Sequence, residues 1–263
     1  MIFDIHTHCF KDSLAKNAIQ TLSAKAGILA YTNGTLDDTV RIMDEAGVYG
    51  FAVLNISVSE HQQKNVNDYA ISINNGRVVA FGSVHPFSQD AISEIDRLKD
   101  NGVKGLKFHN EYQNFDMDDE RAYPVYEYCF NKGLVILFHG GRDLGFNTPL
   151  KASPKRALNV AKTFPKAEFI MAHFGGYGVS DDVIKYLQDT KVQLDTSFTK
   201  GLDVKKINDV IRAFGTKRIY FGSDTPWVTP KESLEFIYRL KLTDEERVDI
   251  LYNNAKRLLE LNF

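Results

Sequence analysis

The chain begins Met-Ile-Phe-Asp-Ile-His-Thr-His, and its two histidines, His6 and His8, stand two residues apart in a β-prone run. In a β-strand, residues two apart lie on the same face. Two imidazoles on one face, at the C-terminal end of a strand, supply half of a metal site. The same spacing also fits an ordinary strand that ends in two polar residues, so the other histidines must decide between the two interpretations.

The seven histidines are distributed in a pattern that favours a metal site. All except His61 follow apolar runs that are expected to be strands, and one aspartate follows the last such run; these residues are His6, His8, His85, His109, His139, His173 and Asp224. In a (β/α)8 barrel the C-terminal ends of the strands form the active site. Neutral imidazoles with one carboxylate, and an open position for water, are the ligands of a catalytic zinc or a similar divalent ion.

The elements that must position these residues alternate along the chain. Eight apolar runs have the continuous apolarity of strands buried on both faces, at residues 2–5, 50–54, 78–84, 105–108, 134–138, 168–172, 192–194 and 218–221. Helical patterns lie between or after them, at residues 37–46, 91–99, 123–131, 154–164, 183–188, 204–214, 233–240 and 244–261. Thr243 and Glu246 form a capping box at the start of the last one. The pattern predicts α/β architecture, a single (β/α)8 TIM barrel over residues 1–263 with its metal site at the C-terminal strand ends.

Residues 9–35 form a segment that is longer than a normal βα loop. We therefore expect this segment to supply lid material over the site.

The composition excludes several functional classes. The chain is 43% hydrophobic and 25% charged, with a formal net charge of −2, so it lacks the basic surface that nucleic acids or anionic membranes require. Its apolar runs are too short to span a bilayer. With only Cys9 and Cys129 available, we expect no disulfide framework, no signal peptide ahead of the motif at residue 4, and a cytoplasmic location. We expect a small-molecule substrate, and a homodimer is left open.

Several motifs together resemble the amidohydrolase superfamily. They are Asp4-x-His6-x-His8, Gly105-x-Lys107-Phe-His109, Phe138-His139-Gly-Gly, Ala172-His173-Phe-Gly-Gly, Phe221-Gly-Ser-Asp224-Thr-Pro-Trp227 and Asn254-Ala-x-Arg-Leu-Leu. The last two narrow the resemblance to the amidohydrolase-related branch that contains the aminocarboxymuconate semialdehyde decarboxylase-like enzymes. The resemblance extends from residue 1 to about residue 261, with the motifs in the expected order.

The resemblance implies roles for individual residues. The metal would be held by His6, His8, His139 and Asp224, while His173 would polarise or protonate the substrate, or bind metal directly in two-metal relatives. In binuclear relatives a carboxylated lysine occupies the position of Lys107. A lysine at the barrel edge or in an ion pair is an equally good interpretation, so we expect one divalent ion, zinc first, with a second left open.

Other residues are candidates around this centre. Asp4 shares the parity of His6 and His8 and should lie below them as a group that supports the ligands. Asp224 is the candidate general base beside the metal. His109, Arg142 and Trp227 are candidate substrate contacts, although an Arg142–Asp143 surface pair and simple barrel packing of Trp227 explain these residues equally well.

The leading functional hypothesis is a metal-dependent hydrolase that acts on a C–N or C–O bond of a small polar molecule through a metal-activated water. The alternative is a metal-dependent carboxy-lyase, a non-oxidative decarboxylase of a small carboxylic acid, because such enzymes share every motif above. A metal-dependent phosphoesterase is disfavoured, since Asp224 is followed by Thr-Pro-Trp where those enzymes have a histidine two residues later. A binding protein without catalysis would not need an open metal position beside an acid.

Overall fold

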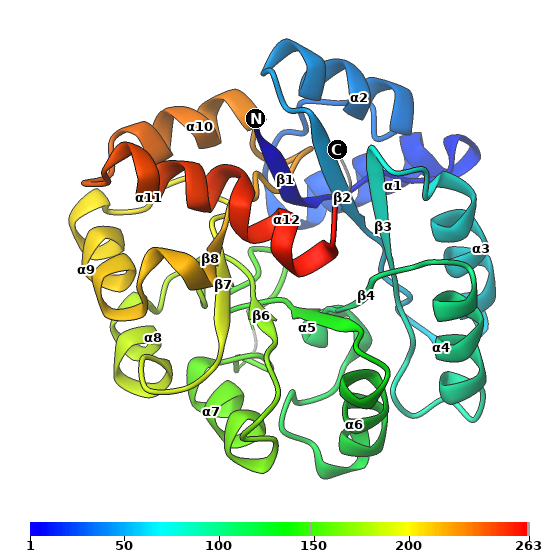
Figure 1. Ribbon diagram of the computed structural model, residues 1–263. Helices are drawn as coiled ribbons and strands as arrows, with labels where there is room; N and C mark the ends of the chain where they lie inside the picture. The colour runs from blue at the N-terminus through cyan, green and yellow to red at the C-terminus, as the bar shows by residue number, and fades with distance from the viewer. Residues whose placement is uncertain (148, 262–263) are drawn as a thin grey trace.

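The computed structural model describes residues 1–147 and 149–261 and shows a barrel of parallel strands surrounded by helices (Figure 1). Eight strands pair in chain order, each parallel to the next. The last strand meets the first through backbone hydrogen bonds, from the Ile5 N–H to the Phe221 carbonyl and from the Asp224 N–H to the His6 carbonyl, both 2.8 Å long. The predicted TIM barrel is confirmed.

The strands lie where the apolar runs predicted them, with most ends shifted by one or two residues. They are β1 (Phe3–Thr7), β2 (Gly50–Leu54), β3 (Val78–Gly82), β4 (Gly105–Phe108), β5 (Val135–Phe138), β6 (Ile170–Met171), β7 (Gln193–Asp195) and β8 (Ile219–Tyr220). The register between β1 and β2 shifts between Asp4 and Thr7. Strict alternation therefore does not hold along the whole of β1.

The main helices are α1 (Asp12–Ala26), α2 (Leu36–Glu45), α3 (Gln63–Ile73), α4 (Ala91–Asp100), α5 (Asn110–Gln113), α6 (Tyr123–Asn131), α7 (Pro154–Thr163), α8 (Ser180–Leu187), α9 (Val204–Phe214), α10 (Pro230–Tyr238), α11 (Asp244–Val248) and α12 (Asn254–Leu259). The capping box of Thr243 and Glu246 is present. The helix expected over 244–261 runs from Asp244 to Leu259, with a π-helical turn over Asp249–Asn253 between α11 and α12, and ends two residues earlier than expected. The sequence patterns did not predict α1, α3 or the short α5.

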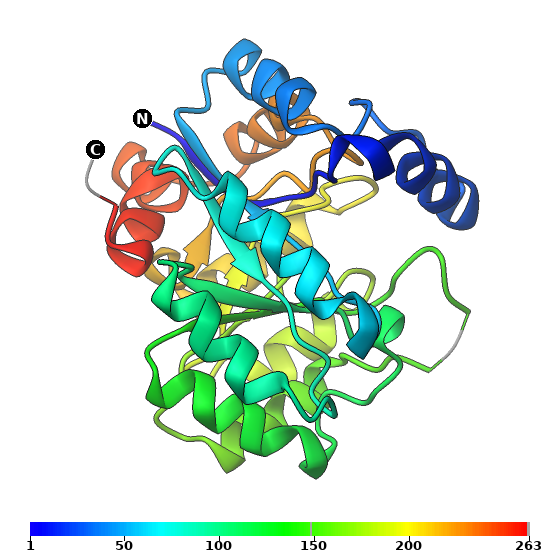
Figure 2. The ribbon, with the colours of Figure 1, turned by 90° about the vertical axis from the view of Figure 1, so that its right-hand side faces the viewer.

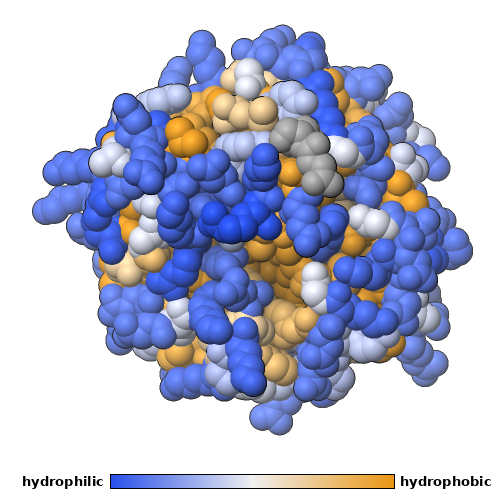
Figure 3. Space-filling view, viewed as in Figure 1, coloured by the Kyte–Doolittle hydropathy of each residue, from blue (hydrophilic) through white to orange (hydrophobic). Residues whose placement is uncertain are grey.

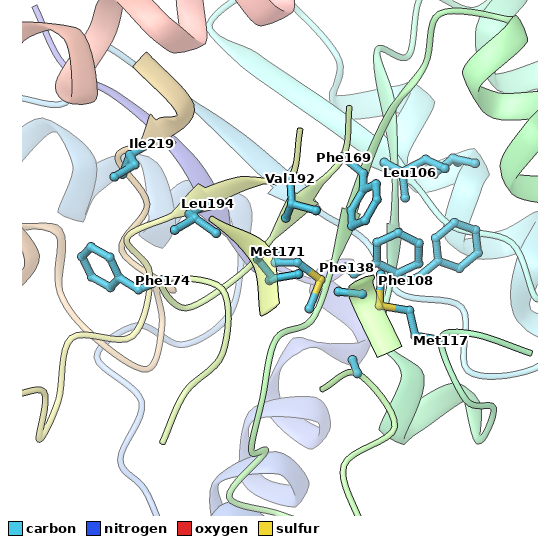
Figure 4. Close-up of a cluster of buried hydrophobic side chains, with 14 of the residues drawn as sticks. Leu106, Phe108, Met117, Phe138, Phe169, Met171, Phe174, Val192, Leu194 and Ile219 are labelled. Atoms are coloured by element: carbon cyan, nitrogen blue, oxygen red, sulfur yellow. The ribbon is translucent and has the colours of Figure 1, made fainter. Parts of the chain in front are cut away.

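Two layers of apolar side chains stabilise the barrel. The outer layer fills the space between strands and helices and includes Phe108, Phe138 and Met171 (Figure 4). The strand residues that alternate with these, such as Leu137 and Ile170, belong to a second cluster together with side chains of α12. Alternate strand residues are thus buried on opposite faces, as a parallel sheet covered by helices requires.

The two ends of the barrel differ. Helix α12 lies across the end at which the strands begin, and the surface there is a mixture of hydrophilic and apolar side chains (Figures 1 and 3). A cavity of about 650 Å3 at this end is lined by residues such as Phe164 and Leu258, and no described histidine lines it. At the other end, α1 and the chain that follows β5 project beyond the strands (Figure 2). No helix in the described part of the chain is both long enough and apolar enough to cross a lipid bilayer.

Candidate functional site

The C-terminal strand ends surround a cavity of about 1090 Å3 that holds the predicted chemical groups. Six of the predicted strand-end residues line it, together with the predicted substrate contacts Arg142 and Trp227; the six are His6, His8, His109, His139, His173 and Asp224. His85 does not join them, and its Nε2 lies 3.1 Å from the Gln113 carbonyl. The expectation that histidines at the strand ends meet at one face is therefore correct for five residues and wrong for His85.

Three of these residues present ligand atoms to one point. The Nε2 atoms of His6 and His8 are 3.2 Å apart, and the Asp224 Oδ1 atom lies 3.3 Å from the first and 3.2 Å from the second. A tetrahedral zinc ion with bonds of about 2.0–2.1 Å would separate its ligand atoms by about 3.3 Å. The spacing of this group therefore fits a small divalent ion.

The partners of the other ring nitrogens show which way these two histidines are protonated. His8 Nδ1 lies 3.0 Å from the Leu54 carbonyl, which can only accept, so Nδ1 must carry the proton. His6 Nδ1 lies 2.7 Å from the Asp195 carboxylate and donates to it in the same way. When the rings are neutral, both Nε2 atoms turn unprotonated lone pairs toward Asp224. Three acceptors at this distance repel one another unless a positive charge lies between them, and a metal cation supplies one.

A hydrogen-bond chain orients the next two histidines. The Ser197 hydroxyl donates to Asp195, so its oxygen accepts from His173 Nδ1 at 2.8 Å. This leaves a lone pair on His173 Nε2, which lies 3.1 Å from His139 Nδ1 and accepts its proton. His139 Nε2 then carries a lone pair, and this buried atom has no hydrogen-bond partner among the described residues. The Nε2 lone pair can therefore bind a metal ion, which is the role that the sequence analysis expected for His139.

His139 nevertheless lies outside the close triangle of His6, His8 and Asp224. Its nearest potential ligand group contains His109 and Asp143, with the three ligand atoms within 4.8 Å of one another. His109 and His139 stack with ring centroids 4.2 Å apart, and His109 Nε2 lies 3.2 Å from Asp143. Asp143 therefore pairs with His109, and the surface pair between Arg142 and Asp143 does not form.

Burial keeps three of these imidazoles neutral, those of His6, His139 and His173. Loss of solvent, followed by the nearby Lys107 ammonium, lowers the pKa of His6 to about 3, and burial also lowers the pKa values of His139 and His173. For Asp195, burial raises the pKa, but His6 more than compensates, so the pKa lies below its ordinary value. The site thus combines neutral imidazoles with an ionised carboxylate near neutral pH, which is the state that metal binding requires.

Lys107 and Asp4 lie fully buried beneath the cavity. The Lys107 Nζ atom is 3.5 Å from His6 Nε2, and burial lowers the pKa of this amine to about 8. One oxygen of Asp4 accepts from the backbone N–H groups of His6 and Ser223, each at 3.0 Å, and thereby joins the exits of β1 and β8. Asp4 supports the backbone of His6 and not its ring, while burial raises the pKa of this carboxyl group to about 7.

The backbone is strained where it enters the cavity. Of the six described non-glycine residues with positive φ, four lie at the ends of β6, β7 and β8: His173, Phe174, Phe198 and Asp224. Side chains with a Cβ rarely adopt this conformation, and it costs of the order of 1–3 kcal/mol per residue. Such strain is found where a fold holds functional groups in place, and here it aims His173 and Asp224 into the cavity.

The sequence analysis missed Asp195 and Ser197, which organise the site. Asp195 is the last residue of β7 and is fully buried. A signal was present, because a carboxylate followed by Thr-Ser closes the apolar run at 192–194 in the same way that His109 closes its own run. The predicted substrate contacts lie at the cavity wall, where Arg142 is exposed and Trp227 is half-buried.

Comparison with known proteins identifies the family. The sequence profile of the family described as amidohydrolase matches residues 3–261. The chain belongs to this family. The recognition from the motifs is confirmed, and with it the expectation of a metal-dependent enzyme. A comparison with curated proteins gave no match.

Solved structures with the same fold cover almost the whole chain. A 2,6-dihydroxybenzoate decarboxylase from Rhizobium is 15% identical, with a TM-score of 0.75 over 99% of this chain and 98% of its own. A dihydroxybenzoic acid decarboxylase from Polaromonas, with bound manganese and 2-nitroresorcinol, is 16% identical, with a TM-score of 0.73 over 100% and 97%. A putative 2-pyrone-4,6-dicarboxylic acid hydrolase from Pseudomonas putida is 14% identical, with a TM-score of 0.72 over 100% and 98%. At this identity the likeness establishes the shared fold.

Proposed function

We propose that the chain is a hydrolase of a C–N or C–O bond in a small polar molecule, with one divalent ion held by His6, His8, Asp224 and His139. The observation that carries the proposal is the triangle of two imidazole nitrogens and one carboxylate oxygen at 3.2–3.3 Å. Nitrogen and oxygen ligands suit zinc, and they also suit manganese, which the Polaromonas decarboxylase holds. Of these metals, we expect zinc to be the one bound.

The residues of the chain would divide the proton transfer between them. When bound, a divalent ion lowers the pKa of a water molecule and polarises a carbonyl oxygen of the substrate. Asp224 is the base that accepts the proton, because the surrounding histidines lower the pKa of its carboxyl group against the effect of burial. His173 lies beside His6, with ring centroids 5.2 Å apart, and can pass the proton to the leaving group or polarise the substrate.

At the cavity wall, Arg142 is the candidate partner for a substrate carboxylate, since a guanidinium binds carboxylate as a fork. Trp227 and His109 are the candidate residues whose aromatic rings contact the substrate. The basis for these three assignments is that each side chain lines the cavity.

A carboxy-lyase is the second candidate, and it fits at least as well with the two decarboxylases that share the fold. In that reaction the C–C bond to the carboxylate breaks, CO2 leaves, and a proton takes its place on the carbon. Asp224 and His173 would manage that proton, since both side chains line the cavity.

One experiment distinguishes the two functions. The purified protein, loaded with zinc or manganese in turn, is incubated with a set of amides, lactones and aromatic acids, and both CO2 release and hydrolysis products are measured. Metal-dependent hydrolysis without CO2 supports the first candidate, and CO2 release supports the second. If neither product forms faster than in the His6→Ala/His8→Ala variant, the proposed site assignment is refuted.

A further inference from the structure

Helix α1 buries much less of its surface than a helix of its length normally does. Of its 15 residues only Ala15 is buried. An amphipathic helix usually turns an apolar stripe toward the core. The stripe of α1 consists of Leu14, Ala18 and Leu22, four residues apart, and all three line the cavity of the functional site. The apolar face of α1 therefore borders empty space and not other core side chains, and Leu14 remains 59% exposed.

The helix is fixed across the mouth of the barrel by contacts beyond both of its ends. After it, the Tyr31 N–H donates to the Pro226 carbonyl at 2.8 Å, and before it the Phe10 N–H donates to the Gly34 carbonyl at 2.8 Å. In its last turn, the Lys25 ammonium lies 3.5 Å from the ring centroid of Phe146, which follows β5. Figure 2 shows α1 projecting beyond the strand ends on the same side as the chain after β5. These contacts hold α1 in place, so the exposure of its apolar face at the mouth of the barrel is part of the folded structure.

The wall opposite α1 comes from α3 and the chain after β2. It contributes Ile56, Val58, Val66 and Tyr69 to the lining, and both helices add neutral polar groups such as Asn17, Thr21 and Asn65. Between α1 and α3 the charged lining residues are Lys11 and Asp68, one of each sign, and on the wall after β5 Arg142 and Asp143 add one more of each sign. By contrast, the inner part holds the five histidines, Lys107 and Asp224. The cavity therefore has a charged, reactive inner end and a mainly apolar outer part.

From these observations we propose that the space between α1 and α3 is a subsite for an uncharged, mainly apolar extension of the substrate. This inference rests on the proposed function, because it places the reacting polar end at His6, His8 and Asp224. The cavity volume of about 1090 Å3 lies just above the range of about 300–1,000 Å3 for pockets that hold drug-sized ligands. The substrate class is thus a carboxylate, amide, ester or lactone with an apolar chain or second ring.

A series of straight-chain hydroxamates, from acetohydroxamate to decanohydroxamate, tests the subsite. Their head group chelates a divalent ion and fixes one end of the probe, while the tail grows by one methylene at a time. Affinities are measured by isothermal titration calorimetry on the zinc-loaded protein. Burial of each methylene in the subsite should tighten binding by about two- to fourfold.

Charged substitutions then locate the tail. Leu22→Asp on α1 and Val66→Asp on α3 should each reduce the gain to less than about 1.5-fold per methylene and leave acetohydroxamate binding unchanged. Leu29→Asp is the matched control, because Leu29 is 78% exposed and does not line the cavity. This control should keep the full gain.

The possible outcomes separate the subsite from the metal site. If the affinity of the unmodified protein does not change with tail length, or if both aspartate variants keep the full gain, the subsite is refuted while the metal assignment stands. If acetohydroxamate binds equally well to the metal-free protein or to the His6→Ala/His8→Ala variant, the proposed metal site is refuted instead.

Discussion

Replacement of Asp195 by asparagine should weaken metal binding, although Asp195 does not belong to the triangle of ligand atoms. One oxygen of its carboxylate accepts three hydrogen bonds, from the backbone N–H groups of His173 (2.9 Å) and Ser197 (3.0 Å) and from the Ser197 hydroxyl. The other oxygen accepts from His6 Nδ1 at 2.7 Å. An asparagine has the same shape but only one acceptor oxygen.

The amide oxygen must take the first position, because two backbone donors there cannot reorient. The amide NH2 then faces His6 Nδ1 and donates to it, which moves the ring proton of His6 to Nε2. The lone pair that should bind the metal is lost unless this network breaks. Loss of such a supporting partner costs about 10- to 100-fold in metal affinity, which corresponds to about 1.4–2.7 kcal/mol.

The assay for Asp195→Asn is competition with a chelator of known affinity, combined with 15N NMR of the histidine rings in the metal-free protein. We expect the weaker affinity together with the Nε2–H tautomer of His6. Ser197→Ala is the matched control for the tautomer, because it removes the link to His173 and leaves the bond between Asp195 and His6; the His6 ring should keep its Nδ1–H tautomer. An Asp195→Asn protein with unchanged affinity and an unchanged His6 tautomer would refute the reasoning.

Three further predictions concern the ligands, the base and a helix cap. The His6→Ala/His8→Ala protein should lose its metal by elemental analysis, and full occupancy would contradict the ligand assignment. Asp224→Asn should keep the fold but lower turnover by about 10²–10⁴-fold, measured in samples of known metal content; near-normal turnover with bound metal would sink the proposed base. Glu246→Gln should lower the free energy of unfolding of the metal-free protein by less than about 1 kcal/mol, because Glu246 accepts from Arg212 and Thr243 near the surface. Since these donors, Arg212 first, lower the pKa of Glu246 to about 2, the difference should be complete above about pH 5 and should shrink as the pH falls toward 2; a difference that grows on acidification would contradict it.

The barrel was predictable because its strands are buried on both faces and leave continuous apolar runs in the sequence. The three helices that the sequence did not reveal, α1, α3 and the short α5, all border the cavity. Helix α1 buries only Ala15, and several residues of α3 also face the open space. On the side that α1 turns to the cavity, Leu14, Ala18 and Leu22 alternate with polar residues such as Asn17 and Thr21, so the apolar periodicity of this helix is weak. The failure to predict α1 and the proposed subsite thus have the same physical cause.

The convergence of His6, His8 and Asp224 was predictable from residue types and strand ends, and the family resemblance singled them out as ligands, whereas the tautomers of the histidines were not predictable. His6 and His8 come together although the register of β1 shifts, since the Asp224 N–H still bonds to the His6 carbonyl. The tautomer of His6 depends on Asp195, which is 189 residues away in the sequence. That contact arises only when β7 and β1 close on the same cavity.

The prediction that histidines at the strand ends line one cavity was correct for His109 and His139 and wrong for His85. The backbone around each of these residues explains the difference. The His139 N–H still bonds to the Phe108 carbonyl of β4, so its side chain stays within the barrel. The His109 N–H has turned to the Gln113 side chain, and His109 lies in the neighbouring cluster with Asp143. The His85 N–H bonds to the Gln63 side chain of α3, three residues after β3 has ended, and its ring lies outside the cavity. Distance from the end of the strand therefore separates His85 from the other two, because His109 and His139 directly follow β4 and β5, and a sequence pattern does not record where each strand ends.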